Sequence, residues 1–225
     1  GALYAARVVN SLQAAGYPCH TVLIPAGERH KTEQTVVHLW EAFLAAGVER
    51  DSTVIALGGG VVGDLTGFAA ATWMRGVQWV YVPTTLLAMA DASLGGKTAI
   101  DLPQGKNLVG AFHPPSLVLA DPETLGTLPE SELRSGLAEV VKHGIIGDPV
   151  LFELMASDGR LPIFEIIPRS LAVKVRIILE DPFEKGQRAA LNLGHTVGHA
   201  VELASGFGLR HGEALLQWAR SERAK

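Results

Sequence analysis

Apolar and polar residues follow two different rhythms in the first half of the chain. Apolar residues three and four positions apart predict amphipathic helices, whereas short apolar runs bounded by glycine or polar residues predict strands. The predicted helices span 4–15, 32–46 and 65–72, and the predicted strands span 21–24, 53–57, 79–82 and 117–120. Helices that alternate with apolar strands are typical of a parallel sheet with helical crossovers, so we expect an α/β fold here.

The second half of the chain has a single rhythm. From about Leu125 onward, apolar residues recur only at helical spacing, as at Leu133, Leu137 and Val140. The prolines expected to interrupt these helices are Pro149, Pro162, Pro168 and Pro182. This half is therefore predicted to be all-helical, with the boundary between the halves near 122–129. A cleft between two such domains is a common place for a binding site.

Composition narrows the function classes only mildly. The 19 lysines and arginines and 23 aspartates and glutamates give a formal net charge of -4, with no long run of either sign, which argues against a nucleic-acid or anionic-membrane partner. Cys19, the only cysteine, cannot form an internal disulfide, and no uninterrupted stretch of about 18 apolar residues predicts a membrane span. We expect a soluble cytoplasmic protein without a signal peptide, because Gly1 leads directly into an amphipathic helix.

A carboxylate and three histidines near the end of the chain are the strongest chemical signal. Glu139, His195, His199 and His211 offer oxygen and imidazole nitrogen, which borderline divalent metals such as zinc accept. If 193–203 is helical, His195 and His199 lie four residues apart on one face. Three protein ligands with one open position would form a catalytic rather than a structural site.

Each of these histidines also has a simpler interpretation as a satisfied polar group at a helix edge. Other histidines lie elsewhere without pattern, at His20, His30, His38 and His113, and His143 follows Lys142 directly. The zinc-protease motif is excluded, because it needs a glutamate directly after the first histidine and this chain has Thr196 there. The residues alone thus leave four candidate ligands for a divalent metal.

The predicted strand 53–57 runs into a glycine-rich turn formed by Gly58, Gly59, Gly60 and Gly63, which ends at Asp64. Without Cβ atoms, such a turn lets backbone N–H groups approach a pyrophosphate at the positive end of the following helix. A tight strand-to-helix connection would look the same. A second segment, 91–98, ends in Gly-Lys-Thr, but Asp91 replaces the leading glycine of a nucleotide-triphosphate loop, so an ATP-hydrolysing loop is not expected.

Several cationic residues lie beside glycine or in apolar surroundings, where a phosphorylated substrate could use them. They are Arg75, Lys97, Lys106 next to Asn107, Lys142 and Arg188. The alternative for each is ordinary surface charge. Thr84 and Thr85 end a predicted strand, where they could bind a ligand or cap the next segment of the chain.

Read together and in order, these motifs resemble those of the 3-dehydroquinate synthase family of sugar-phosphate cyclases. They are Pro25-Ala26-Gly27-Glu28-Arg29-His30-Lys31, the triple-glycine turn ending in Asp64, Pro83-Thr84-Thr85, Asp91 to Thr98, Gly105-Lys106-Asn107, Ala138-Glu139-Val140-Val141-Lys142, Leu191-Asn192-Leu193-Gly194-His195 and His211-Gly212-Glu213. The resemblance covers nearly the whole chain, with a segment expected to be missing at each end.

The resemblance implies a Rossmann-like NAD-binding domain over 1–124, an all-α metal-binding domain over 125–225, and an active site between them in a homodimer. It implies zinc or cobalt on Glu139, His195 and His211, with His199 contacting the substrate phosphate instead. The implied NAD contacts are Glu28, Lys31, Gly58, Gly59, Gly60, Asp64, Thr84, Thr85, Lys97, Lys106, Thr124, Leu125 and Thr127. The implied substrate contacts are Arg75, Asp91, Lys97, Asn107, Lys142, Arg188, Asn192 and His199.

The reaction implied by the resemblance converts 3-deoxy-D-arabino-heptulosonate 7-phosphate into 3-dehydroquinate and phosphate. Hydride passes from C5 to NAD, phosphate is eliminated, the hydride returns, and an intramolecular aldol closes the ring. Three alternatives remain: a related cyclase such as 2-deoxy-scyllo-inosose synthase, a metal-dependent polyol dehydrogenase, and an inactive fragment. The first alternative is disfavoured, because Arg188 and Asn192 suit the carboxylated heptulosonate better than the other sugars on which related cyclases act. The alternative of an inactive fragment arises because we expect this sequence to lack the family's N-terminal strand and its C-terminal helical tail, which carries a lysine in the family.

Overall fold

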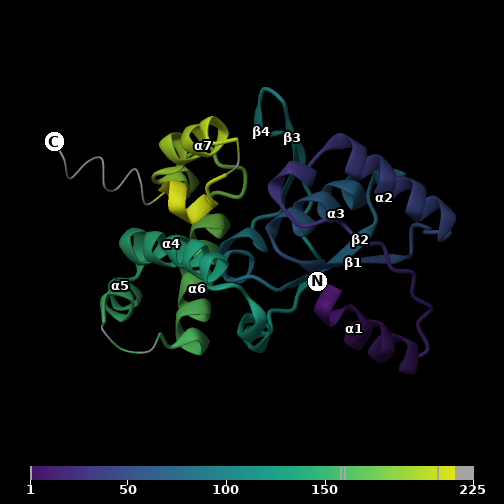
Figure 1. The fold of residues 1–225 in the computed structure, drawn as a ribbon, viewed down its shortest axis with the longest axis horizontal. Coiled ribbons are helices and arrows are strands. Elements are labelled where there is room, and N and C mark those ends of the chain that lie inside the picture. The colour runs from purple at the N-terminus through teal and green to yellow at the C-terminus, as the bar shows by residue number, and fades with distance from the viewer. Residues whose placement is uncertain (1, 158, 160, 207, 216–225) are drawn as a thin grey trace. The chain divides into compact units, whose positions relative to one another are not determined.

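A three-stranded parallel sheet forms the centre of the first half of the chain (Figure 1). The computed structural model describes residues 2–157, 159, 161–206 and 208–215. Strand β1 (Thr53–Gly58) pairs with β2 (Gln78–Pro83), which pairs with β5 (Leu117–Val118). Helix α3 (Gly60–Thr72) connects β1 to β2, and the register places Thr53 beside Gln78 and Gly58 beside Pro83. These elements confirm the expected α/β class.

Helices α1 (Ala2–Ala14) and α2 (Glu33–Ala45) agree with the predicted positions. Helix α2 begins where Thr32 accepts a hydrogen bond from the backbone N–H of Thr35, an N-cap contact that satisfies one free donor of the first turn. Its apolar face packs on α3, in a core formed by Val36, Leu39, Phe43, Leu65, Phe68, Ala69 and Ile100. Burial of this apolar face holds α2 and α3 together beside β1.

One strand prediction for this half was wrong, and one hairpin was missed. Residues 21–24 belong to no strand in the described part of the chain. An antiparallel hairpin of β3 (Lys97–Leu102) and β4 (Gly105–Phe112) was not predicted. Strand β4 carries glycine, lysine and asparagine and is mostly exposed, so the apolar alternation that marks a strand is absent from it. A strand also needs a pairing partner, which a local pattern does not report.

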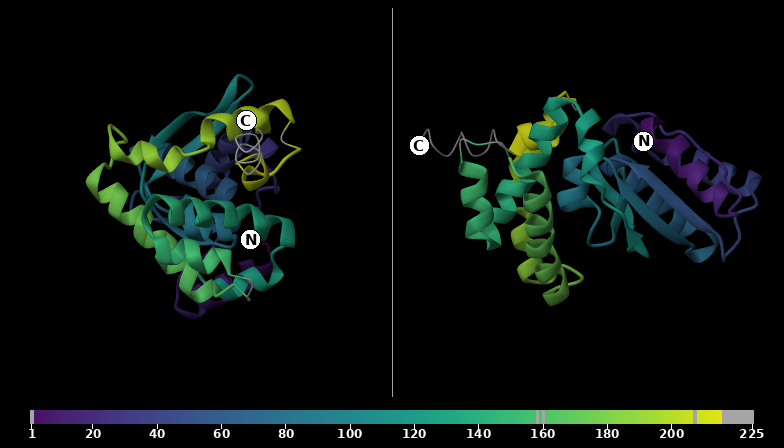
Figure 2. Two further views of the ribbon diagram at one scale, coloured as in Figure 1. Left: turned by 90° about the vertical axis from the view of Figure 1, so that its left-hand side faces the viewer. Right: turned by 90° about the horizontal axis from the view of Figure 1, so that it is seen from below.

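The second half is helical in all its described elements, as predicted (Figures 1 and 2). The long helices are α4 (Glu130–Gly147), α5 (Pro149–Ala156), α6 (Ile163–Glu180) and α7 (His195–Ala204), with shorter turns η4 (Pro122–Thr127) and η5 (Gln187–Asn192). Interruptions at Pro149, Pro162 and Pro182 are confirmed. The break predicted at Pro168 was wrong, because Pro168 lies inside α6, whose buried stripe outweighs the lost backbone hydrogen bond.

The structure divides into two compact units, Gly1–Thr84 with Gly96–Ala120 and Thr85–Gly95 with Asp121–Lys225. The second unit thus contains the π-helical turn η3 (Ala88–Ala92), which sequence analysis placed in the 1–124 half. The reason is close packing on α4: a Cβ on Gly136 would lie 2.6 Å from the backbone nitrogen of Leu87. The division into functional domains at 124 and 125 stays a prediction. Among the described residues, no helix is both long and apolar enough to cross a membrane.

Candidate metal centre and nucleotide turn

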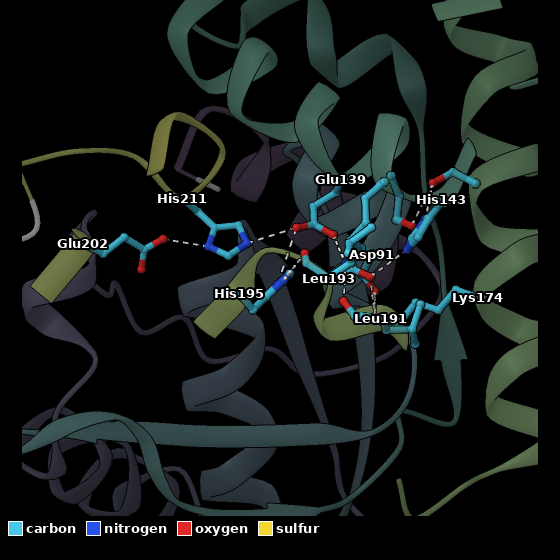
Figure 3. Close-up of polar contacts among 12 residues, drawn as sticks. Asp91, Glu139, His143, Lys174, Leu191, Leu193, His195, Glu202 and His211 are labelled. Atoms are coloured by element: carbon cyan, nitrogen blue, oxygen red, sulfur yellow. Dashed lines mark hydrogen bonds and ion pairs between the residues drawn. The ribbon is translucent and has the colours of Figure 1, made fainter. Parts of the chain in front are cut away.

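Glu139, His195 and His211 come together in the second unit (Figure 3). Glu139 is fully buried in α4, His195 begins α7, and His211 follows α7. Their ligand atoms all lie within 4.8 Å of one another. The Oε1 atom of Glu139 is 3.1 Å from Nε2 of His211 and 3.6 Å from Nε2 of His195.

The spacing of these atoms fits a small divalent ion. Zinc binds imidazole nitrogen and carboxylate oxygen at about 2.0–2.2 Å in tetrahedral geometry, which places neighbouring ligand atoms roughly 3.3–3.6 Å apart. The two measured separations, 3.1 Å and 3.6 Å, bracket this value closely. One carboxylate and two imidazoles suit zinc or cobalt and leave a fourth position open for substrate.

The three groups differ in charge. Burial and the nearby charge of Asp91 oppose ionisation of Glu139, yet the hydrogen bond from His211 and the charge of Lys142 hold its pKa at about 2. Burial disfavours the protonated form of His211, but hydrogen bonds to Glu139 and Glu202 raise its pKa to about 9. Burial is the largest influence on His195 and lowers its pKa, which favours the neutral imidazole that can ligate a metal.

His199 belongs to a different group of potential ligands. It lies one helical turn beyond His195, with the ring centroids 5.2 Å apart, and it is grouped with Glu202 and His211. The structure therefore brings His199 to the edge of the cluster built around Glu139. Its expected contact with a substrate phosphate stays a prediction.

Asp91 lies at the centre of a buried charged network beside Glu139. Its Oδ1 atom is 2.7 Å from Nζ of Lys174 and 3.3 Å from Nε2 of His143. His143 in turn is 2.7 Å from the hydroxyl of Ser170. Burial opposes ionisation of Asp91, but Lys174 and Lys142 hold its pKa well below the usual range, so it is a carboxylate at neutral pH.

Lys174, His143 and Ser170 were not singled out from the sequence. Lys174 and Ser170 lie four residues apart on the buried stripe of α6, next to Val173 and Ile177. A lysine and a serine on an otherwise apolar helical stripe are the signal that was missed, because such residues are rarely buried without a partner. Asp91, Glu139 and His143 also have metal-ligand spacing, but Lys142 and Lys174 already bring ammonium groups to the two carboxylates.

Arg188 and Asn192, the residues expected near a substrate carboxylate, lie on η5. Arg188 is 2% exposed, and its guanidinium donates to the carbonyl oxygens of Pro182 and, at 3.0 Å, of Gly95. Asn192 donates to the carboxylate of Glu184. The turn before η5 is held by Asp181, which accepts the backbone N–H of Arg188 at 3.1 Å. Lys142 donates to the carbonyl of Leu191 at 2.7 Å, which connects η5 to α4.

The glycine turn of the first unit lies between β1 and the N-terminus of α3. Gly58 ends the strand, Gly59 caps the helix, and Gly60 begins it. The carbonyl of Gly59 accepts the hydroxyl of Tyr81 at 2.9 Å, and that of Gly58 accepts the N–H of Thr84 at 2.9 Å. A fixed turn at the positive end of a 13-residue helix is suited to a pyrophosphate.

Four of the expected NAD contacts form a cluster in the same unit. Lys31, only 3% exposed, is 2.5 Å from Asp64 and 3.9 Å from Glu28, which is 2.9 Å from Lys106. Burial opposes protonation of Lys31, but Asp64 and Glu28 outweigh it and raise its pKa. Burial is also the largest influence on Asp64 and raises its pKa.

Asn107, expected as a substrate contact, joins this cluster by accepting a hydrogen bond from Lys31. Asn107 has a left-handed backbone, with φ of 56°, and its N–H donates to Asp101 at 2.8 Å. Asp101 was missed, because its contact with the N–H of Asn107 joins residues six positions apart across the hairpin and leaves no local signal in the sequence. Asp101 is also 4.0 Å from Lys31, so the cluster holds three carboxylates for two lysines.

The structure leaves other expected residues apart from these clusters. Arg75 is exposed on a left-handed turn, with φ of 70°, and lines a pocket of about 320 Å³ next to Gln78 and His113. The turn with Arg75 precedes β2, whereas the glycine turn follows β1. Because β1 and β2 are parallel, the two turns lie at opposite ends of these strands. Lys97 is exposed at the start of β3. The remaining expected contacts, Thr85, Thr124, Leu125 and Thr127, belong to the second unit.

Comparison with known families supplies the decisive observation. Residues 21–135 match the family model described as 3-dehydroquinate synthase N-terminal, and residues 136–217 match 3-dehydroquinate synthase C-terminal. The chain belongs to the 3-dehydroquinate synthase family. The matched ranges contain the glycine turn, the Lys31 cluster and the Glu139 centre.

Several curated 3-dehydroquinate synthases are about half identical to this chain. That of Synechococcus sp. (strain CC9605) is 53% identical over 222 residues, which cover 94% of this chain and 60% of the relative. That of Synechocystis sp. is 52% identical and is covered to 62%. The chain thus spans about three fifths of the length of its 3-dehydroquinate synthase relatives.

Solved structures of related cyclases have the same fold. The 2-epi-5-epi-valiolone synthase from Streptomyces hygroscopicus, with NAD+ and Zn2+ bound, has a TM-score of 0.90 at 33% identity and covers 95% of this chain and 62% of its own. A 2-deoxy-scyllo-inosose synthase with carbaglucose-6-phosphate, NAD+ and Co2+ has a TM-score of 0.82 at 32% identity, covering 93% and 59%. An archaeal alcohol dehydrogenase, at 16% identity and a TM-score of 0.65, shares the fold alone.

Proposed function

We propose that this chain provides the NAD-binding and metal-binding parts of an enzyme that converts 3-deoxy-D-arabino-heptulosonate 7-phosphate into 3-dehydroquinate and phosphate. The observation that carries the proposal is the group Glu139, His195 and His211, with ligand atoms within 4.8 Å, in a member of the 3-dehydroquinate synthase family. We further propose a cytoplasmic homodimer, as the family resemblance implies.

Glu139, His195 and His211 would hold zinc or cobalt. A divalent ion at this position supplies Lewis acidity, which lowers the pKa of a coordinated substrate hydroxyl. The neutral state favoured for His195 and the ionised state of Glu139 are those that a metal requires. His211 would bind through Nε2, the atom that faces Glu139.

The glycine turn and the Lys31 cluster would hold NAD, which supplies a reversible hydride acceptor. Backbone N–H groups at the start of α3 would bind the pyrophosphate, because they have no acceptor within the helix. Glu28, Lys31, Asp64 and Lys106 already lie together, and their carboxylates can accept hydrogen bonds from ribose hydroxyls.

The remaining charged residues would orient the substrate. Lys142 and Arg188 would bind the carboxylate, together with Asn192, whereas Lys97, Arg75 and His199 would bind the phosphate. Asp91 is ionised and fixed by Lys174 at 2.7 Å, so it can accept a hydrogen bond from a hydroxyl of the sugar without reorienting. The contribution of these groups is positioning and stabilisation of developing charge.

Phosphate release tests the proposal. The chain would be incubated with zinc, NAD and the heptulosonate phosphate, with glucose 6-phosphate as the alternative substrate. We expect phosphate release from the first substrate only, with no net accumulation of NADH because the hydride returns. Preference for the hexose phosphate would indicate a different cyclase, and a steady gain in NADH absorbance a dehydrogenase. Binding of both cofactors without turnover would show that this chain alone is inactive, whereas failure to bind NAD or zinc would contradict the proposal.

A further inference from the structure

Glu202 is a buried carboxylate for which the family resemblance gives no role. It lies near the end of α7 and is 1% exposed. An ionised carboxylate loses several kcal/mol of hydration on burial unless hydrogen bonds or an opposite charge replace it. Glu202 finds such a partner in His211, whose Nδ1 atom is 2.7 Å from its Oε1.

His211 is therefore bonded through both ring nitrogens, as Figure 3 shows. Its Nδ1 faces Glu202, and its Nε2 faces Glu139 at 3.1 Å. An ionised carboxylate only accepts hydrogen bonds, so the contact with Glu202 requires the proton of the imidazole to be on Nδ1. Without a metal, the contact of Nε2 with Glu139 places a proton on this nitrogen as well. A metal ion that binds here displaces the proton on Nε2 and uses its lone pair, while the proton on Nδ1 stays with Glu202.

The backbone around His211 supports the same orientation. Glu202 follows His195 by seven residues, two helical turns, so both side chains lie on one face of α7. The N–H of Gly212 donates to the hydroxyl of Ser135 at 2.9 Å, and a Cβ on Gly212 would lie 2.3 Å from the carbonyl oxygen of Ser135. His211 is thus held against α4 by its backbone and against α7 by its ring.

Glu202 could instead be a metal ligand itself, since His199, Glu202 and His211 also have ligand spacing. In that arrangement Glu202 would release Nδ1 of His211, its partner at 2.7 Å. A metal held by Glu139, His195 and His211 leaves the hydrogen bond between Nδ1 of His211 and Glu202 in place, because it binds Nε2 of His211. The geometry therefore favours Glu202 as the support of a ligand.

We propose that Glu202 is a positioning residue that fixes the tautomer and ring orientation of His211 so that Nε2 is presented to the metal. The inference rests on the proposed function and extends it to a residue outside the expected ligand set. Partners of this kind typically change metal affinity by about 10- to 100-fold when they are removed.

Zinc affinity, measured by competition with a chromophoric chelator, tests the inference. We expect Glu202→Ala to weaken zinc binding by about 10- to 100-fold. Glu202→Gln should weaken it less, because its amide oxygen still accepts from Nδ1. Glu153→Gln removes an exposed carboxylate from α5 of the same unit and should leave the affinity unchanged. His211→Ala should abolish binding at this site.

A second measurement on the metal-free chain does not depend on activity. Imidazole ¹⁵N spectra should show a slowly exchanging Nδ1–H on His211, which is lost in Glu202→Ala and retained in Glu202→Gln. Should Glu202→Ala fail to fold, the Gln variant and the wild-type spectrum still decide: a proton on Nε2 alone would overturn the inference.

Two outcomes separate this inference from the proposed function. If a folded Glu202→Ala binds zinc as tightly as the wild type while His211→Ala does not bind, the role of Glu202 is contradicted and the metal site stands. If His211→Ala also binds normally, the metal site itself is wrong. Stronger loss in Glu202→Ala than in His211→Ala would indicate that Glu202 is a ligand, and would overturn the positioning role.

Discussion

A single buried charge, that of Lys31, connects the members of the candidate NAD cluster. Lys31, 3% exposed, is the shared partner of Asp64 and Glu28 and a donor to Asn107. Removal of the buried lysine leaves a partly buried carboxylate without its cation, which costs more than the pair contributes to stability. The cluster is therefore expected to be sensitive to substitution even in the absence of NAD.

We expect Lys31→Met to lower the free energy of unfolding by about 3–5 kcal/mol, because Asp64 loses the cation that lies 2.5 Å away, whereas Glu28 keeps Lys106 at 2.9 Å. Adding Asp64→Asn should restore part of this loss. The loss should also shrink as the pH falls, since the pKa of Asp64 is already raised by burial and rises further without Lys31. Urea unfolding of both variants at neutral and acidic pH measures this, with the exposed Lys185→Met as the control. Equal stability of Lys31→Met and the wild type would contradict it.

At the residue scale, the sequence predicts types of ligand better than their supports. The types of side chain alone indicate four candidate ligands, Glu139, His195, His199 and His211, and only the family resemblance reduces them to the three without His199. His143, Lys174 and Glu202 escape notice because their roles depend on burial and on partners far along the chain. His143 and Asp91 are 52 positions apart yet 3.3 Å apart in space.

Helix boundaries in the second unit depend on individual side chains. Helix α5 begins at Pro149, directly after Asp148. The carboxylate of Asp148 accepts a hydrogen bond from the backbone N–H of Leu151 at 3.1 Å and forms an ion pair with Arg169 at 3.1 Å. Burial acts against ionisation of Asp148, but these contacts outweigh it and lower its pKa. The carboxylate therefore stabilises the start of α5 only in its ionised form.

We expect Asp148→Ala to lower the free energy of unfolding by about 1 kcal/mol at neutral pH, the usual contribution of an N-cap. Because the pKa of Asp148 is lower in the folded state, its contribution is complete above the unfolded value near 3.9 and disappears as the pH falls through the folded value. Urea unfolding at pH 7 and below pH 3 measures this. A difference between variant and wild type that persists at the lower pH would contradict it.

Pro168 allows the opposite prediction, a gain in stability. It is the sixth residue of α6, where it removes a hydrogen bond to the carbonyl of Phe164 and crowds that group. Pro168→Ala should raise the free energy of unfolding by about 1–3 kcal/mol, reduced by the greater freedom of the unfolded chain. Pro162→Ala, at the helix N-cap, is the control and should give no such gain, because no intrahelical bond is missing there. Thermal unfolding compares the two.

At the element scale, helices and parallel strands were predictable because burial on one face leaves a periodic pattern. Strand β1 and helix α2 show this directly. The hairpin β3–β4 left no such pattern, since β4 is largely exposed and its pairing with β3 includes a register shift between Ile100 and Leu102. Pro168 is the opposite case, in which a local signal predicted a break that does not occur. Burial of six residues of α6 stabilises the helix across this proline.

For the molecule as a whole, the two units carry separate candidate sites, so each cofactor should stabilise its own unit. A ligand that binds only the folded state adds about 2.7 kcal/mol at one hundred times its dissociation constant. Such stabilisation is local where the units open independently, and hydrogen exchange resolves it by segment.

We therefore expect zinc alone to slow amide exchange in α4 around Glu139 and from His195 to His211, and NAD alone to slow exchange in the Gly58–Gly60 turn and around Lys31. His211→Ala should remove the first effect and leave the second intact, because the two sites lie in different units. Exchange measured by mass spectrometry with each cofactor in turn distinguishes this from a general effect. If zinc slowed exchange equally in both units, or NAD protected neither the turn nor Lys31, the assignment of each cofactor to its unit would be wrong.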